Sequence, residues 1–274
     1  MHRILSFLLA LTIIGSCDTV EAPYIEPNSL NCNYDDDAPV RKVLIEDFTG
    51  YQCVNCPRAT DELKSIVERY PCHVIPVAIH YGFFAEPAFG TEDPDYRTPE
   101  GAAIGEYFEV TQALPIGMVN RRAENGNYNL DYEDWAIKLV EQVTASLYAD
   151  VEILASANFT ADSLLEYSIE INDISILNVN MHVVASLLEN KVISKQKDGS
   201  QTVYDYEHNH MLRAGVMEDP IWGTPANLPF NRNFSYAVPS GVTWNLDNME
   251  LLVYVYNSDT KEIIQAEVFH IDGI

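Results

Sequence analysis

The stretch that decides the fold is "DFTGYQCVNCPRA", residues 47–59, in which two cysteines stand two residues apart. A short apolar run at residues 43–45 precedes it and predicts a buried strand, which Gly50 interrupts. From Pro57 onward, apolar residues recur at helical spacing with charged residues on the other faces. Cys53 and Cys56 are therefore expected on the first turn of a helix that follows a strand.

This placement has chemical consequences for the two thiols. The unpaired amides and the positive dipole end of a helix N-terminus stabilise a thiolate and lower a cysteine pKa. A second apolar run at residues 73–80 predicts the next strand, which gives a strand–helix–strand unit. A Cys-x-x-Cys beside such a unit is typical of thioredoxin-like redox proteins. Further on, Pro115 opens a predicted strand over residues 116–120.

Residues 41–147 thus resemble the thioredoxin superfamily, and the resemblance assigns roles to individual residues. The matching positions are Cys53 as nucleophile, Cys56 as resolving cysteine, Pro115 as the cis-proline facing the dithiol, Phe48 as the strand-end aromatic and Asp47 as the buried acid that assists proton transfer. The sequence departs from the family where a tryptophan commonly precedes the first cysteine, because Tyr51 and Gln52 stand there. Residues 83–99 form a predicted surface loop, either a lid or substrate rim or a tolerated insertion.

Composition and charge narrow the class of protein. The 274 residues are 47% hydrophobic and 21% charged, an ordinary globular composition whose length favours two domains. The formal net charge of −25 repels phosphate backbones and anionic lipid surfaces. We therefore expect no nucleic-acid partner and no membrane contact by the folded part.

The N-terminus predicts export. One basic residue precedes an apolar run at residues 4–14, too short to span a bilayer, so residues 1–16 are predicted to be a signal peptide. Residues 14–17, "IGSC", resemble a bacterial lipobox, which implies lipidation of Cys17; the alternative is an ordinary signal peptide with a chance cysteine. Residues 17–40, rich in proline and acidic residues, are predicted to be a tether.

With Cys17 lipidated, four cysteines remain and allow three pairings. Cys72 follows the predicted helix, roughly 20 Å or more from Cys53 and Cys56, whereas bridged cysteines need Cα atoms about 4.4 to 6.8 Å apart. The expected bridges are therefore Cys53–Cys56 and a structural Cys32–Cys72 bridge. A structural zinc site made by the four thiols and a purely structural Cys53–Cys56 bridge are the alternatives.

Residues 148–274 change to short alternating strands and predict an all-β antiparallel sandwich, Ig-like in class. The seven predicted strands cover residues 151–159, 164–171, 180–188, 202–212, 234–238, 249–256 and 263–271. Within the fourth strand, His208 and His210 alternate and would project from one face. The two histidines could hold a metal, but the favoured alternative is that they are exposed or lie at a domain interface. No metal or other cofactor is therefore expected.

The whole layout is similar to the outer-membrane-protein-28-type lipoproteins of Gram-negative anaerobes. The similarity rests on the lipobox, "EDFTGYQCVNCPRA", "LPIGMVNR" and "HNHMLR" in this order. It implies a lipid-anchored protein on the periplasmic or surface face of the outer membrane. The expected activity is thiol–disulfide exchange with envelope proteins, in which Cys53 attacks, Cys56 resolves, Pro115 shapes the groove and Asp47 relays the proton. The alternative is a non-catalytic binding, adhesion or structural lipoprotein on a thioredoxin-like scaffold.

Overall fold

The computed structural model describes residues 38–91, 93–111 and 113–272. The predicted signal peptide, the lipid attachment at Cys17, most of the tether and Cys32 lie outside the described residues. Among the described residues, each helix is too short or too polar to cross a membrane.

The first part of the chain contains the predicted strand–helix–strand unit. The elements follow in the order β1 (Val43–Thr49), α1 (Cys56–Arg69), β2 (Val74–His80), η2 (Phe83–Ala85), α2 (Pro99–Tyr107), β3 (Ile116–Val119), η3 (Tyr132–Asp134) and α3 (Trp135–Ala145). β1 pairs in parallel with β2 on one side and antiparallel with β3 on the other. The Leu114–Pro115 peptide bond that leads into β3 is cis, as the resemblance implied.

The second part consists of strands, with one short 3-10 helix among the described residues. Its elements are β4 (Val151–Phe159), β5 (Leu164–Asp173), β6 (Met181–Glu189), β7 (Val192–Asp198), β8 (Gln201–His208), β9 (Met211–Gly215), β10 (Thr224–Pro225), β11 (Phe230–Ala237), η4 (Leu246–Asn248), β12 (Met249–Asn257) and β13 (Ile263–His270). The predicted continuous strand over residues 202–212 is wrong, because the chain turns at Asn209 and His210, where His210 has a φ of 55°. β7 was not predicted.

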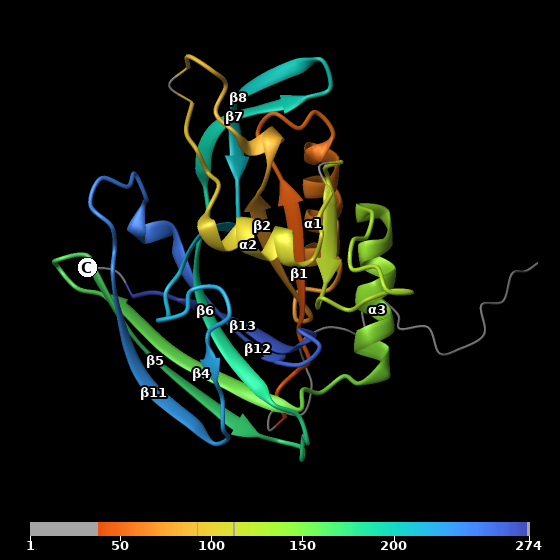
Figure 1. The fold of residues 1–274 in the computed structure, drawn as a ribbon, viewed down its shortest axis with the longest axis vertical. Coiled ribbons are helices and arrows are strands. Elements are labelled where there is room, and N and C mark those ends of the chain that lie inside the picture. The colour runs from red at the N-terminus through yellow and green to blue at the C-terminus, as the bar shows by residue number, and fades with distance from the viewer. Residues whose placement is uncertain (1–37, 92, 112, 273–274) are drawn as a thin grey trace, which may run out of the picture.

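One sheet joins both parts of the chain. Its strand order is β13-β12-β6-β9-β2-β1-β3, and β10 pairs with β6. β9 lies parallel to β2, which connects the late strands to the early ones. Strands β11, β5 and β4 form a second sheet at the opposite side of the molecule from α1 and α3 (Figure 1). The coarse expectation of a mixed α/β fold dominated by strands is confirmed, and the division into residues 41–147 and 148–274 stays a prediction.

The large sheet curls until its first and last strands lie close together. Gln265 of β13 accepts a hydrogen bond from the Lys42 amide and donates one to the Val40 carbonyl, both at 2.9 Å. The Ile263 amide donates to the Asn120 carbonyl just after β3, also at 2.9 Å. β13 is therefore tied to the segments that flank β1 and β3.

Side chains of β1 alternate between two buried layers. Leu44 and Phe48 face a core cluster that also contains Cys53 and Cys56. Val43 and Ile45 face the opposite way, into the cluster under α1 and α3. Because side chains alternate along a strand, Asp47 shares the face of Ile45 and lies on the α1 side of the sheet.

Candidate functional site

Cys53 and Cys56 form a disulfide at the start of α1, with their Cα atoms 5.4 Å apart. Pro57 occupies the first turn of the helix, where its missing amide costs no intrahelical hydrogen bond. Leu63 and Ile66 on the buried stripe of α1 pack under the sheet and hold the helix in place. Both cysteines are almost fully buried: Cys53 is 2% exposed and Cys56 is 1% exposed.

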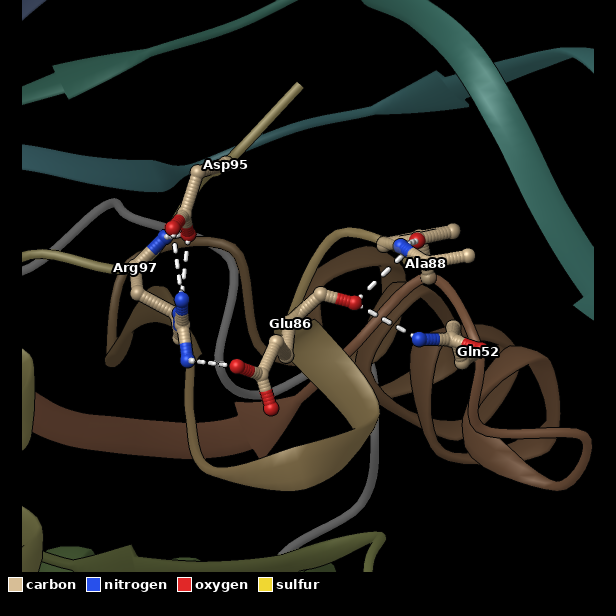
Figure 2. Close-up of polar contacts among 6 residues, drawn as sticks. Gln52, Glu86, Ala88, Asp95 and Arg97 are labelled. Carbon is tan, nitrogen blue, oxygen red and sulfur yellow. Dashed lines mark hydrogen bonds and ion pairs between the residues drawn. The ribbon is translucent and has the colours of Figure 1, made fainter. Parts of the chain in front are cut away.

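The loop after β2 lies against the dithiol loop. A Cβ atom at Gly50 would come within 2.5 Å of the Phe84 backbone, so only glycine permits this approach. The Gln52 amide donates to the Phe84 carbonyl at 2.9 Å, and the Gln52 side chain donates to the Glu86 carbonyl at 2.6 Å (Figure 2). The predicted loop at residues 83–99 is therefore attached to the dithiol segment.

The same loop is braced by charged side chains. Figure 2 shows the Arg97 guanidinium between two carboxylates. It donates to Asp95 at 2.9 and 2.7 Å and lies 3.8 Å from Glu86. These exposed pairs contribute little individually, but together they fix the segment that carries the Glu86 carbonyl.

A hairpin that the sequence reading missed covers the dithiol from the other side. We call strands β7 and β8, residues 192–208, the dithiol cap; they lie beside the start of α1 in Figure 1. The Lys197 amide donates to the Tyr51 carbonyl at 2.8 Å, and the Gly199 amide donates to the Val54 carbonyl at 2.9 Å. The signal for the hairpin was Asp198-Gly199, a turn pair between two alternating runs.

Gln196 connects the cap to the first cysteine. A register shift between Ser194 and Gln196 marks a bulge in β7, and bulges redirect side chains. The buried Gln196 amide donates to the Cys53 carbonyl at 3.0 Å and to the Gly50 carbonyl at 3.3 Å. The cap therefore binds the backbone of the dithiol loop directly.

Asp47 is the buried acid that the sequence predicted. Its side chain is 1% exposed, and its Oδ1 atom has no hydrogen-bond partner among the described residues. Burial raises the pKa of Asp47 to about 7, because the charged form loses its hydration. The carboxyl group can therefore take up and release a proton near neutral pH.

Asp47 opens into a cavity of about 210 Å³, which we call the acid cavity. Its walls come from the sheet, from α1 and from the cap and the turn that follows it. The lining residues are Asp47, Thr49, Thr60, Leu63, Lys64, Val67, Glu68, Pro76, Ala78, His80, Gln196, Tyr206, His208, Asn209 and His210. Thr60 lines this cavity one helical turn after Cys56, and its hydroxyl donates to the Cys56 backbone carbonyl at 3.3 Å.

Two buried histidines in the acid cavity carry unsatisfied ring nitrogens. Neither nitrogen of His80 has a hydrogen-bond partner among the described residues, and the Nε2 of His208 has none either. Burial lowers the pKa of His80 well below its ordinary value and that of His208 to about 4. His80 was not among the predicted site residues. Its place at the end of β2, the strand that pairs with the strand of Asp47, could have indicated that the two side chains lie close together.

The structure brings His208 and His210 into the lining of one cavity, although not by the predicted alternation within one strand. His208 ends β8, and His210 stands in the turn before β9. No group of three or more histidine, cysteine or acidic side chains in residues 38–272, as far as these are described, could hold a metal ion.

The remaining predicted site residues are placed as follows. Leu114, next to Pro115, lies in the core cluster that contains Cys53 and Cys56. Cys72 is buried and disulfide-bonded. The expected partner, Cys32, lies outside the described residues, so the Cys32–Cys72 pairing stays a prediction.

Solved structures share this architecture at low sequence identity. HBP35 of Porphyromonas gingivalis is 15% identical with a TM-score of 0.65, over 85% of this chain and 76% of that one. A protein from Agrobacterium tumefaciens is 16% identical with a TM-score of 0.51, over 84% of this chain and 95% of that one. These likenesses show the fold alone. No curated protein sequence matches the chain.

Sequence comparison with family models identifies the family. The model described as outer membrane protein Omp28 matches residues 102–272, which is more than half of the chain. A domain of the outer membrane lipoprotein Omp28 from Porphyromonas gingivalis is 23% identical with a TM-score of 0.36, over 46% of this chain and 90% of that one. The match of the family model over more than half of the chain shows that the chain belongs to the outer membrane protein Omp28 family, which confirms the family and the outer-membrane location that its motifs implied.

Proposed function

We propose that this lipoprotein catalyses thiol–disulfide exchange through Cys53 and Cys56, on a thioredoxin-like domain formed by residues 41–147. The observation that carries the proposal is the combination of a disulfide at a helix N-terminus with the buried Asp47 on the preceding strand, whose Oδ1 atom has no hydrogen-bond partner among the described residues. A buried acid without a partner destabilises a fold, and such groups concentrate at functional sites. The parallel β1–β2 pair, the antiparallel β3 and the cis-Pro115 support the domain assignment.

The proposed chemistry uses the two sulfurs in sequence. In the reduced protein, the Cys53 thiolate attacks a disulfide of an envelope protein, and one substrate thiolate leaves. The Cys56 thiol then loses its proton to Asp47, attacks the Cys53 sulfur and releases the second substrate thiolate. The substrate is reduced, and the protein returns to the disulfide form that the structure contains. The reverse sequence would oxidise a dithiol substrate.

The dithiol cap imposes a condition on this activity. Cys53 is only 2% exposed, whereas exchange requires an attacking or attacked sulfur to be reached in line. The hydrogen bonds of Gln196, Lys197 and Gly199 to the dithiol loop must therefore open before a substrate can react.

The burial of both cysteines favours one second candidate, a non-catalytic binding or adhesion protein in which the bridge is structural. Cys53 and Cys56 pack among apolar side chains of the main core cluster, as a stabilising disulfide would. In this case the fold is retained as a scaffold.

The reduction potential of the Cys53–Cys56 pair separates the two candidates. We would equilibrate the protein with defined thiol buffers and count alkylated cysteines by mass, with a Cys53→Ser/Cys56→Ser double variant to subtract the other cysteines. Exchange proteins fall at about −120 to −270 mV, and structural bridges fall below about −300 mV. We expect a potential between about −120 and −270 mV. A potential below about −300 mV would contradict exchange and support the non-catalytic scaffold.

A further inference from the structure

We propose that the acid cavity is a hydrated proton path in which His80 and His208 carry protons between Asp47 and solvent. The proposal rests on the proposed exchange activity and adds two positioning residues to it, neither of which touches the sulfurs.

The strand register places Asp47 and His80 on one surface of the sheet. Asp47 pairs with Ala78, and His80 follows Ala78 by two residues, so the three side chains point to the same face. All three line the acid cavity. A proton on Asp47 therefore faces the same enclosed space as the ring of His80.

The second histidine continues the path from the sheet to the cap. The ring centroids of His80 and His208 are 5.5 Å apart, and the ring of Tyr206 lies 4.8 Å from that of His208. His208 is oriented by a hydrogen bond from its ring to the Lys195 backbone. The three aromatic side chains thus form a continuous row from β2 to the end of β8.

The unsatisfied ring nitrogens point to an occupant that forms hydrogen bonds. His80 is 3% exposed and His208 is 7% exposed, yet three of their four ring nitrogens have no partner among the described residues. A buried polar atom without a hydrogen bond costs about 1–3 kcal/mol, and a cavity of about 210 Å³ into which several such atoms open has room for waters that would bond to them. Water would satisfy the two imidazoles and the Asp47 Oδ1 atom together.

Burial, with a smaller contribution from Arg213, favours the neutral form of both imidazoles. The titratable groups around the path come from several elements: Lys64 and Glu68 of α1, Tyr96 before α2, Tyr206 of β8, His210 of the following turn and Arg213 of β9. Burial is the main cause of the lowered pKa of His80 and of His208, and Arg213 adds to it in both cases. A neutral imidazole accepts a proton on one nitrogen and donates one from the other, which a relay requires.

The proposed path moves one proton from Cys56 to solvent and needs no further reactant. When Cys56 resolves the mixed disulfide, its proton passes to the Asp47 carboxylate. A water carries the proton to the free nitrogen of His80, and His80 releases a proton from its other nitrogen toward the water beside His208. His208 takes up that proton on Nε2, its free nitrogen, and releases it from the same nitrogen to a water nearer the solvent, while its other nitrogen keeps the hydrogen bond to the Lys195 backbone. Both rings return to the neutral form.

The test measures the two chemical steps separately. Reduced full-length protein in detergent is mixed with excess dithiodipyridine, which releases one coloured thiopyridone when Cys53 attacks and a second when Cys56 resolves. A Cys56→Ser variant identifies the second phase. The variant under test is His208→Ala, and the matched control is His182→Ala, a histidine on β6 outside the cavity lining.

At pH 6, below the Asp47 pKa of about 7, most molecules start with Asp47 protonated, and this proton must leave along the path before Asp47 can accept that of Cys56. We therefore expect His208→Ala at pH 6 to leave the first phase unchanged and to slow the second at least 10-fold, since groups that transfer protons contribute about 10² to 10⁴-fold. Added imidazole, which can enter the space left by the ring, should restore the second phase in this variant and not in His182→Ala. An unchanged second phase, or equal slowing of both phases without rescue, would overturn the relay and leave exchange intact. A wild-type protein that lacks the second phase would instead refute exchange itself, and the relay with it.

Discussion

At the scale of single residues, Asp47 combines a structural cost with a proposed chemical role. Its carboxyl group is buried on β1, faces the acid cavity and has an unsatisfied oxygen among the described residues. A leucine at this position would pack without that cost, as Ile45 does on the same face. The proposed exchange activity explains why an acid stands there, because Cys56 needs a nearby group that accepts its proton.

Asp47 should give the folded protein a specific pH dependence. Its folded pKa of about 7 lies above the ordinary value of 3.8, so between these values the folded state holds a proton that the unfolded state has lost. The contribution of Asp47 to the free energy of unfolding therefore falls as pH rises from about 4 to about 7 and is level above that. We expect Asp47→Asn to remove this fall and to be more stable at pH 8, by on the order of 4 kcal/mol.

The measurement is denaturant unfolding of the oxidised protein at a series of pH values. Asp61→Asn, an exposed acid on α1, serves as the control and should keep the wild-type slope. An Asp47→Asn protein with the same slope as the wild type would show that Asp47 titrates normally.

At the scale of elements, the β7–β8 hairpin sets the accessibility of the disulfide. The hairpin forms a separate two-stranded sheet. It contacts the dithiol loop through two backbone hydrogen bonds, the side chain of Gln196, and the side chains of Lys195 and Lys197, which reach Tyr51 and Gln52. A two-stranded hairpin alone is marginally stable. Opening of the cap is therefore less costly than unfolding of the α1 region.

Gln196→Ala should make the disulfide easier to reduce. The substitution removes the hydrogen bonds to the Cys53 and Gly50 carbonyls, each worth about 1 kcal/mol, so cap opening should become roughly 30-fold more frequent. We expect the rate of reduction by dithiothreitol to rise by a similar factor, measured by trapping the released thiols with an alkylating agent. Thr202→Ala, at an exposed position of β8, is the control; equal rates in all three proteins would mean that the cap does not limit access.

At the scale of the whole molecule, one buried ion pair joins early and late strands. Arg121, after β3, donates to both oxygens of Glu46 on β1, at 2.9 and 2.6 Å. The same guanidinium donates to the Tyr254 hydroxyl of β12 at 3.1 Å and lies 5.4 Å from the ring centroid of Phe108. The interior of the curled sheet therefore contains a polar connection among apolar walls.

Removing one partner of this pair should be more harmful than removing both. Arg121→Met leaves the Glu46 carboxylate buried and unpaired, which typically costs about 3–5 kcal/mol. We expect that loss in the free energy of unfolding measured with urea, and recovery of most of it in the double variant Glu46→Leu/Arg121→Met. Arg122→Met, next in sequence with an exposed side chain, is the control. Additive losses in the double variant would show that the two side chains do not interact.

The sequence predicts the local elements of this structure and not its long-range contacts. Residues 43–80 were predictable because a buried strand, an amphipathic helix and a second apolar strand each carry a local pattern. The end of β8 at His208 was not predictable. The chain turns there through His210, whose φ is positive, and the alternation of apolar and polar residues gives no sign of that turn. Likewise, the cavity brings together His80 and His208, which only the pairing of β9 with β2 makes neighbours.

The contact between Gln265 and the Lys42 amide spans 223 residues of sequence. Folds dominated by such distant pairings form slowly, because the entropy of closing a long loop is lost before the contact is gained. Strand β1, which leads directly into the dithiol, therefore gains its last neighbour only after nearly all of the described chain has been made. Until the later strands are in place, the two thiols are open to the surroundings of the folding chain, which therefore first decide the oxidation state of Cys53 and Cys56. The dithiol cap, residues 192–208, covers them afterwards.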